Sequence, residues 1–178
     1  MSESDVGLVA RVAAGDEEAL FELHRQYVNL VFSMALRVLS SPAEAEEITQ
    51  EVFLTIWRRA ESYDPARGSV ATWLLTISRR RAIDRLRRRN RRPPVTEFLE
   101  RVGEEAAAPA PPLHVDLREA LLSLPARQRA IIELIYFGGY TYREVAEALE
   151  LPLGTVKSRV RLAMEKLRRA LLVLLTVG

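Results

Sequence analysis

The sequence of 178 residues contains no cysteine and only two histidines, His24 and His114. The absence of cysteine excludes a disulfide framework, a thiolate nucleophile and a cysteine-ligated metal. The histidines lie far apart without metal-ligand spacing, so we expect no metal and no cofactor. A glycine-rich phosphate loop and a nucleophile beside a base are also missing, which argues against an enzyme.

Long apolar segments are missing as well. No apolar run approaches the roughly 18 residues that would span a bilayer. The acidic, amphipathic N-terminus, residues 1–18, is unlike the basic and then apolar pattern of a signal peptide. We therefore expect a cytoplasmic protein with no membrane insertion of its own.

The net charge of only +2 hides strong charge blocks. Residues 1–61 and 93–116 are net acidic (−6 and −4), whereas residues 62–92 and 117–178 are net basic (+8 and +4). Blocks of this size predict separate surfaces for separate partners, two of them suited to phosphate.

The apolar residues follow a helical period nearly everywhere. Gly15 is placed to end a first helix, and Asp16, Ser41 and Ser69 are placed to cap the next three. A long second helix is indicated by apolar residues that step by three or four, namely Leu20, Leu23, Tyr27, Leu30, Met34 and Val38. No strand-like alternation is sustained, so the expected fold class is all-α.

The helical pattern stops at residues 91–113, which contain two proline pairs and an alanine–proline tract. Such a composition is typical of a flexible, mostly extended linker, here with a short helix near residues 97–101. We expect two small helical domains, residues 1–92 and 115–178, joined by a linker at 93–114.

Residues 125–171 have the pattern of a helix-turn-helix. A helix ends at Gly138 and Gly139, Thr141 caps a short helix, and a break at 150–154 precedes a longer helix that Thr155 is expected to cap. Glu150 stands in the turn, where many such motifs have glycine in a left-handed conformation.

The longer of these helices has two different faces. One arc is apolar and is expected to face the core; it consists of Val156, Val160, Met164, Leu167 and Leu171. The other side carries short hydrogen-bonding and cationic side chains near the helix start, as a recognition helix does. The alternative is an amphipathic helix whose basic face is only solvated.

Nine of the fourteen residues from 79 to 92 are arginine. Helical spacing places several of them on one arc that also includes an aromatic residue; the arc is Trp73, Ile77, Arg80, Asp84 and Arg88. A tryptophan beside cations suits a strand with exposed bases, because the ring stacks and the cations hold phosphates. Core packing of Trp73 is the alternative, and Asp84 is expected to orient the arginines.

Four stretches, in this order, resemble the extracytoplasmic-function sigma factors, the two-domain promoter-recognition subunits of bacterial RNA polymerase. AEEITQEVFLTIW (45–57) resembles the helix that binds the polymerase clamp. YDPARGSVATWL (63–74) and IDRLRR (83–88) resemble the loop and helix that capture an unpaired −10 base. Residues 124–171 resemble the domain that reads the −35 element. Arg80 stands where many members have asparagine.

The resemblance implies a sigma region 2 type bundle followed by a region 4 type helix-turn-helix domain, with no active site. It implies that the chain directs transcription initiation with core RNA polymerase (clamp and flap) and promoter DNA as partners. The WLLTISRRRAIDRLR stretch (73–87) is similar to members that are often held by a membrane-anchored anti-sigma factor, which is therefore a further expected partner.

Three sets of site residues follow from the motifs and the resemblance. The set expected to bind core polymerase is Glu46, Glu47, Gln50, Glu51, Phe53 and Trp57. The set expected at −10 DNA is Asp64, Arg67, Ser69, Trp73, Arg80, Arg81, Asp84, Arg85 and Arg88. The set expected at −35 DNA is Tyr142, Arg143, Thr155, Lys157, Ser158, Arg159 and Arg161.

Two alternatives stay open. A stand-alone helix-turn-helix repressor, with the first domain used for dimerisation, explains the second domain but leaves the face from Trp73 to Arg88 without a purpose. The apolar C-terminal tail either packs Leu171, Leu174 and Leu175 on Ile131, Leu134 and Ile135, or forms an exposed patch for the polymerase flap or an anti-sigma helix.

Overall fold

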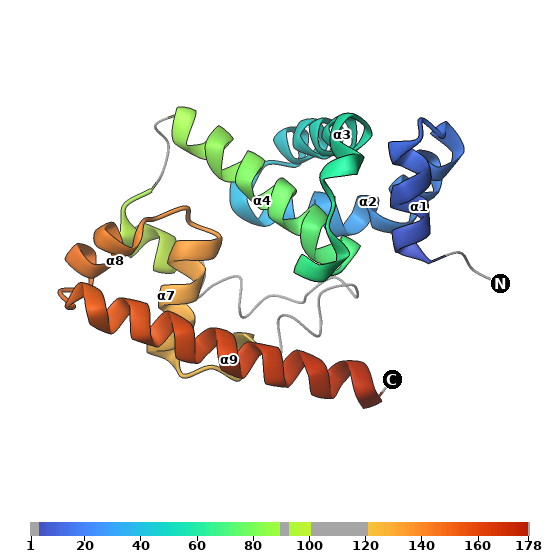
Figure 1. Ribbon diagram of the computed structural model, residues 1–178. Coiled ribbons are helices and arrows are strands. Elements are labelled where there is room, and N and C mark those ends of the chain that lie inside the picture. Colours follow the sequence, from blue (N-terminus) through green and yellow to red (C-terminus); the bar gives the residue numbers. More distant parts are fainter. Residues whose placement is uncertain (1–3, 90–92, 101–120, 178) are drawn as a thin grey trace. The chain divides into compact units, whose positions relative to one another are not determined.

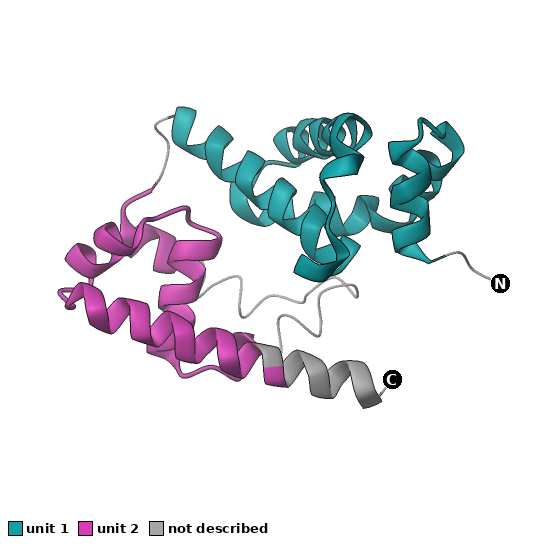
Figure 2. Cartoon of the chain, in the orientation of Figure 1, with its two compact units in different colours: residues 1–90 teal, residues 91–178 magenta. Residues whose placement is uncertain are grey.

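The computed structural model describes residues 4–89, 93–100 and 121–177. Regular structure in these ranges is entirely helical, which confirms the predicted all-α fold class. The chain divides into two compact units, residues 1–90 and residues 91–178 (Figure 2). Within the described ranges, no helix is both long and apolar enough to cross a membrane.

Unit 1 is a bundle in which one long helix packs against three others (Figure 1). That helix is α2 (Glu17–Leu39), and its neighbours are α1 (Asp5–Ala13), α3 (Pro42–Arg59) and α4 (Val70–Arg88). Two short 3₁₀ turns, η1 (Ala60–Ser62) and η2 (Pro65–Arg67), connect α3 to α4. The largest fully buried side chains of this bundle are aliphatic: Val12, Leu23, Val31, Val38, Ile48, Val52, Ile56, Val70 and Leu74.

The three predicted caps of unit 1 are present. The side chains of Asp16, Ser41 and Ser69 accept hydrogen bonds from backbone N–H groups three residues on, at 3.1, 3.5 and 3.3 Å. Gly15, with φ of +87°, separates α1 from α2. Local sequence therefore determines where these helices begin, because each cap satisfies an N–H that the helix leaves without a partner.

Two polar contacts hold the helices of unit 1 together. The Tyr27 hydroxyl on α2 donates to the Asp5 carboxylate on α1 at 2.5 Å, and burial together with this bond raises the pKa of Tyr27. The fully buried Ser78 hydroxyl on α4 donates to the backbone oxygen of Val31 on α2 at 3.0 Å. Each bond joins two different helices, between residues 22 and 47 positions apart, so together they favour one packing of the bundle.

Unit 2 contains α7 (Ala126–Tyr136), α8 (Tyr142–Ala148) and α9 (Leu153–Val177). The helices pack around aliphatic side chains that include Ile131, Leu134, Val145, Val156 and Val160. Thr141 caps α8 through a reciprocal capping box with Glu144, as its position predicted. A Cβ on Gly138 would lie 2.7 Å from the Tyr140 ring, which explains a glycine after α7.

Part of the expected linker is folded in unit 2. Residues 95–100 are helical, close to the expected short helix at 97–101, although Arg101 lies outside the described residues. Phe98 is only 2% exposed and its ring lies 5.8 Å from that of Tyr140 in an edge-on arrangement. The Tyr140 hydroxyl also donates to the backbone oxygen of Pro93. The segment 93–100 thus contributes to the core of unit 2.

Two expectations for α9 are wrong. The helix begins at Leu153 rather than after a Thr155 cap, because the Pro152 oxygen already accepts from the N–H groups of Thr155 and Val156 at 2.9 and 3.2 Å. Met164 is 39% exposed, and Ala163 takes its place on the buried arc with Val156, Val160 and Leu167. At this point of the helix, the buried position is therefore 163 and not 164.

Candidate nucleic-acid and polymerase interfaces

A groove of about 580 Å³ lies between α3 and α4 in unit 1. All five residues of the predicted aromatic and cationic arc of α4 line it: Trp73, Ile77, Arg80, Asp84 and Arg88. The opposite wall comes from α3, from Ile48 to its end, and from η1. The structure therefore gathers the predicted arc in one concave site.

Trp73 is half-buried at this groove. Its ring centroid lies 5.2 Å from that of Tyr63 with a tilt of 46°. The Tyr63 hydroxyl in turn donates to the Gly68 oxygen at 3.0 Å, which ties the aromatic pair to the connecting loop. Trp73 thus packs on Tyr63 on one side and lines the groove on another. Packing within the unit and exposure at the groove do not exclude each other for this residue.

The connecting loop uses two of the predicted site residues to shape itself. Asp64 accepts from the N–H of Ala66 at 3.0 Å and caps η2, while Ser69 caps α4. The exposed Arg67 follows at the end of η2. The polar side chains of Asp64 and Ser69 are thereby engaged in positioning the backbone.

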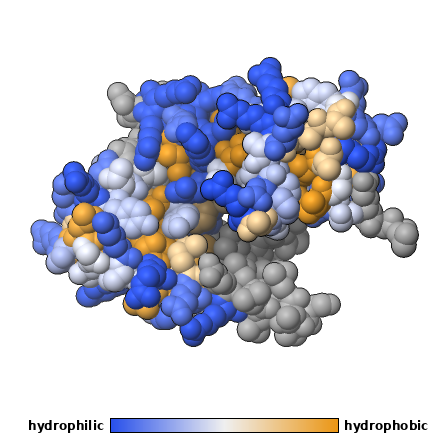
Figure 3. All heavy atoms as spheres, in the orientation of Figure 1, coloured by the Kyte–Doolittle hydropathy of each residue, from blue (hydrophilic) through white to orange (hydrophobic). Residues whose placement is uncertain are grey.

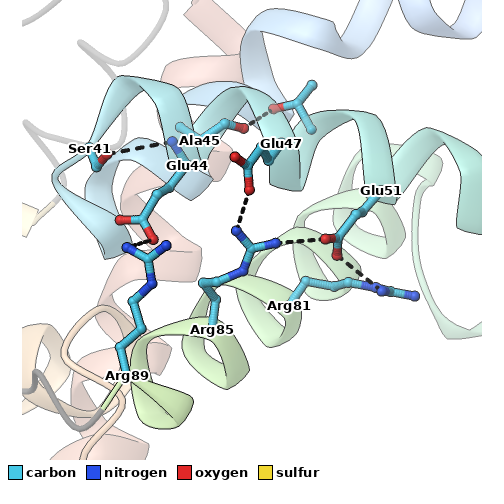
Figure 4. A network of polar contacts seen from close by, with 9 residues as sticks. Ser41, Glu44, Ala45, Glu47, Glu51, Arg81, Arg85 and Arg89 are labelled. Atoms are coloured by element: carbon cyan, nitrogen blue, oxygen red, sulfur yellow. Dashed lines mark hydrogen bonds and ion pairs between the residues drawn. The ribbon is translucent and has the colours of Figure 1, made fainter.

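Arginines of α4 form a ladder with carboxylates of α3 (Figure 4). Arg85 donates to both Glu47 at 2.6 Å and Glu51 at 2.7 Å. Arg81 donates to Glu51 at 3.2 Å and to the Thr55 hydroxyl at 2.8 Å. The hydrogen bond that Arg85 donates to the Glu47 carboxylate is the main cause that raises the pKa of Arg85.

One further ion pair joins the end of α4 to α3, and the other groove arginines of α4 are not part of this ladder. Arg89, just after α4, pairs with Glu44 near the start of α3 (Figure 4). Arg80 and Arg88 are exposed and form no ion pair among the described residues. Asp84 is also exposed and forms no hydrogen bond or ion pair with an arginine within the described part of the chain, so the structure does not support the expectation that it orients them.

The residues expected to bind core polymerase divide by exposure. Glu46, Glu47 and Gln50 are exposed on α3, and Glu51 and Trp57 are half-buried. Phe53 is only 6% exposed, and its ring lies 4.6 Å from that of His24 on α2. Phe53 is therefore a core residue, which corrects its place in the predicted surface, because the bundle turns this side of α3 toward α2.

Sequence reasoning missed part of the groove wall. Arg58 and Arg59 are exposed at the end of α3 and line the groove opposite Trp73, together with Thr55 and Ser62. The two arginines lie within residues 1–61, whose net charge is acidic, so a sum of charges over that block does not reveal them. They follow Glu51 by seven and eight residues, which is two helical turns, so helical spacing could have placed them on the same side of α3 as Glu51.

The visible surface of unit 1 is mostly hydrophilic. Figure 3, in the orientation of Figure 1, shows hydrophilic side chains over much of unit 1, with apolar side chains visible between them. The exposed large hydrophobic residues of unit 1 are few: Val6, Phe21 and Leu54. Hydrophilic side chains thus cover much of the visible face of unit 1 (Figure 3).

The second candidate site lies at the start of α9. Lys157, Ser158 and Arg161 are exposed there, whereas Thr155 and Arg159 are half-buried. The Ser158 hydroxyl donates to the Thr155 oxygen at 2.9 Å, which leaves its oxygen lone pairs as acceptors. On α8, Arg143 is exposed and Tyr142 is half-buried.

The turn before α9 has the predicted conformation. Glu150 has φ of +51°, in the left-handed region that favours glycine. The backbone of α9 is helical to Val177, but the packing of Leu171, Leu174 and Leu175 lies outside the described side chains.

Comparisons with known proteins match both units of the chain. The model of Sigma-70 region 2 matches residues 23–92, and that of Sigma-70 region 4 matches residues 114–167. The chain is 40% identical over 157 residues to ECF RNA polymerase sigma factor RpoE of Cereibacter sphaeroides, covering 86% of this chain and 87% of that protein. It is 38% identical over 174 residues to ECF RNA polymerase sigma factor SigK of Mycobacterium tuberculosis, covering 92% and 91%.

A solved structure shares the fold of the chain. SigE of Rhodobacter sphaeroides, in complex with the anti-sigma ChrR, is 35% identical, with a TM-score of 0.51. The match covers 94% of this chain and 99% of SigE. Relatives this similar span nearly the whole chain, and the two region models occur in the expected order. The chain therefore belongs to the extracytoplasmic-function (ECF) RNA polymerase sigma factors.

Proposed function

We propose that this chain binds core RNA polymerase through the exposed face of α3 and directs it to promoters through the groove of unit 1 and the start of α9. The observation that carries this proposal is the groove of unit 1. Trp73 and Arg80 line it from α4, and Arg58 and Arg59 line it from the end of α3.

The groove suits an unpaired −10 strand better than a duplex. An aromatic side chain can stack on an exposed base, and the surrounding guanidinium groups can hold the adjacent phosphates. Arg80 and Arg88 make no ion pair within the described residues, so their charge is available to DNA. Arg67, in the adjoining loop, can add a phosphate contact.

The start of α9 suits base readout in duplex DNA. A helix that enters the major groove reads base edges with side chains near its N-terminus. A forked donor such as Arg159 can pair with guanine, while Lys157 and Arg161 are exposed and suited to phosphates. Tyr142, Arg143 and the Ser158 hydroxyl can position the helix on the backbone of the duplex.

Polymerase and regulatory partners complete the proposal. The exposed Glu46, Glu47 and Gln50, with Glu51 and Trp57, offer acidic and amphipathic contacts to the polymerase clamp, and unit 2 is proposed to contact the flap. We infer that the chain acts in the bacterial cytoplasm as a regulator without an active site of its own. An anti-sigma factor is a further proposed partner, since SigE is known in complex with ChrR.

Transcription in vitro tests this function directly. Core polymerase with the purified chain should initiate transcription at a subset of a genomic promoter library, whereas core polymerase alone should not. In a gel-shift assay, the free chain should fail to bind the selected duplexes that the holoenzyme binds. Sequence-specific binding by the free chain alone would support a stand-alone repressor instead.

A double variant tests the polymerase surface. Glu46 and Gln50 are exposed on α3 and lie outside the ladder, so Glu46→Lys with Gln50→Lys changes the surface charge without breaking an ion pair. We expect at least a tenfold loss of affinity for core polymerase, about 1.4 kcal/mol, with an unchanged circular dichroism spectrum.

The matched control is Glu61→Lys on η1, which is also exposed but lies outside the proposed surface. It should bind core polymerase as the natural chain does. Equal binding by the control and the double variant would remove α3 from the polymerase interface.

A further inference from the structure

The carboxylates proposed to bind polymerase and the arginines proposed to bind DNA contact each other in unit 1. Glu47 and Glu51 together hold Arg85, and Glu51 also holds Arg81 (Figure 4). These four side chains carry two charges of each sign, so their sum is zero. Arg81 and Arg85 line the same groove as Trp73, yet their charge there is offset by α3.

Exposure differs between the two sides of the ladder. The Glu47 side chain is 62% exposed, whereas that of Arg85 is 21% exposed. An incoming cationic partner can therefore reach Glu47 from solvent. Both terminal nitrogens of the Arg85 guanidinium are bonded to carboxylates, so its charge is offset at the place where a phosphate would bind.

We propose that this ladder couples the two surfaces: cations of the polymerase that pair with Glu47 and Glu51 release Arg81 and Arg85 to hold phosphates of the −10 strand. In the free chain, single-stranded DNA then meets Arg67 and the groove cations that form no ion pair among the described residues, which are Arg58, Arg59, Arg80 and Arg88. Holoenzyme assembly adds two cations to the same groove. This inference rests on the proposed function and adds a reason why DNA affinity rises only after polymerase is bound.

The coupling follows from electrostatics at short range. A carboxylate within hydrogen-bond distance lowers the field of a guanidinium at a nearby phosphate, and the effect is greatest where the pair is partly shielded from water. The bonds here are 2.6–3.2 Å long. A second cation that shares the carboxylate weakens its hold on the arginine, because the two cations compete for the same oxygens.

The test removes the carboxylate charges from the full chain in the absence of polymerase. The probe is a fluorescein-labelled single strand of about twelve thymidines, with binding measured by anisotropy across a salt series. Each phosphate contact with a single strand steepens the salt slope by about 0.7, so two released arginines should add about 1.4. We expect Glu47→Gln with Glu51→Gln to bind the strand about tenfold more tightly at 0.1 M salt.

A charge-matched control separates release of arginines from a general change in net charge. Glu17→Gln with Glu18→Gln removes the same two charges from exposed positions at the start of α2, outside the lining of the groove. It should raise affinity by less than about twofold, since exposed charges that do not contact the groove cations are largely screened by salt. Equal gains in the two double variants would overturn the coupling.

A second arm tests the arginines themselves. Arg81→Gln with Arg85→Gln should change strand binding little in the natural background, where both are already paired. In the Glu47→Gln, Glu51→Gln background it should abolish the gain, and lysine at both positions should restore part of it. A gain that survives loss of both arginines would overturn the coupling even if all variants fold, as checked by melting temperature.

Failure of the coupling is distinguishable from failure of the proposed function. If the glutamine variants lose core polymerase without gaining affinity for the strand, the polymerase surface stands and the coupling is wrong. If they gain affinity for the strand and still assemble normally with core polymerase, the release from α3 is real but polymerase is not its trigger, which also overturns the coupling.

Discussion

Single arginines in this chain have different environments, and those environments predict different roles. Arg88 is exposed at the groove of unit 1 without an ion pair among the described residues, as expected for a phosphate contact. Arg159 is half-buried near the start of α9. Its planar fork is suited to a base edge, because it presents two donors in the geometry of bidentate pairing.

Alanine at position 159 and alanine at position 88 should impair promoter binding in different ways. Arg159→Ala should reduce discrimination among −35 sequences by about 1–3 kcal/mol, since a bidentate contact to a base is lost. Arg88→Ala should instead weaken binding to all promoters alike and make the salt slope shallower. The measurement is holoenzyme binding to a panel of promoters that differ only in the −35 element, at several salt concentrations.

Lysine at position 88 is the control for charge. Arg88→Lys should restore most of the affinity, whereas Arg159→Lys should not restore discrimination, because lysine lacks the fork. A uniform loss of affinity across the panel for both alanine variants would contradict the recognition role of Arg159.

At the level of elements, the turn between α8 and α9 is the most constrained connection in unit 2. It joins the two helices of the helix-turn-helix in four residues, from Leu149 to Pro152. The turn requires a left-handed residue, and the sequence provides Glu150 with φ of +51°. A side chain costs about 1–2 kcal/mol in this conformation, which other interactions of the unit must offset.

Glycine at position 150 should therefore stabilise the protein. We expect Glu150→Gly to raise the free energy of unfolding by about 0.5–1 kcal/mol, since relief of the left-handed strain exceeds the entropy that glycine adds to the unfolded chain. Chemical denaturation of the full chain, followed by circular dichroism, measures the change.

The same substitution three residues earlier provides the contrast. Glu147 is exposed within α8, where glycine is expected to lower the free energy of unfolding by about 1 kcal/mol. Destabilisation by both substitutions would mean that Glu150 makes a contact worth more than its backbone strain.

At the scale of the whole molecule, the packing of segment 93–100 extends unit 2 beyond the helix-turn-helix. The region 4 model matches only residues 114–167, yet Phe98 is among the largest fully buried side chains of the chain. Its contact with Tyr140 lies directly before the cap of α8. The segment can therefore influence the stability of unit 2 from outside the residues that the region 4 model matches.

Truncation of Phe98 tests this contribution. Phe98→Ala should lower the free energy of unfolding by about 3–5 kcal/mol, because a buried aromatic side chain is lost and a cavity remains. Scanning calorimetry of the full chain should show a lower melting temperature for one transition. Thr96→Ala, an exposed change on the same short helix, should leave the melting profile nearly unchanged. Indistinguishable profiles for the two variants would exclude segment 93–100 from the core of unit 2.

The sequence by itself determined the features that depend on neighbours along the chain. Asp16, Ser41, Ser69 and Thr141 could be read as caps because a cap acts on an N–H three residues away. The left-handed Glu150 could be expected from its place in the turn. The arc from Trp73 to Arg88 could be found because helical periodicity alone puts those residues on one face.

Only the tertiary structure decided which of these residues face a partner and which face the protein. Arg81 and Arg85 bond carboxylates and a hydroxyl that lie 26–38 residues away in the sequence, and no local pattern identifies such a pair. Phe53 turns toward His24, and Phe98 packs beside Tyr140, for the same reason. Helical spacing assigns a residue to a face of its own helix, but the packing of other helices determines whether that face is covered.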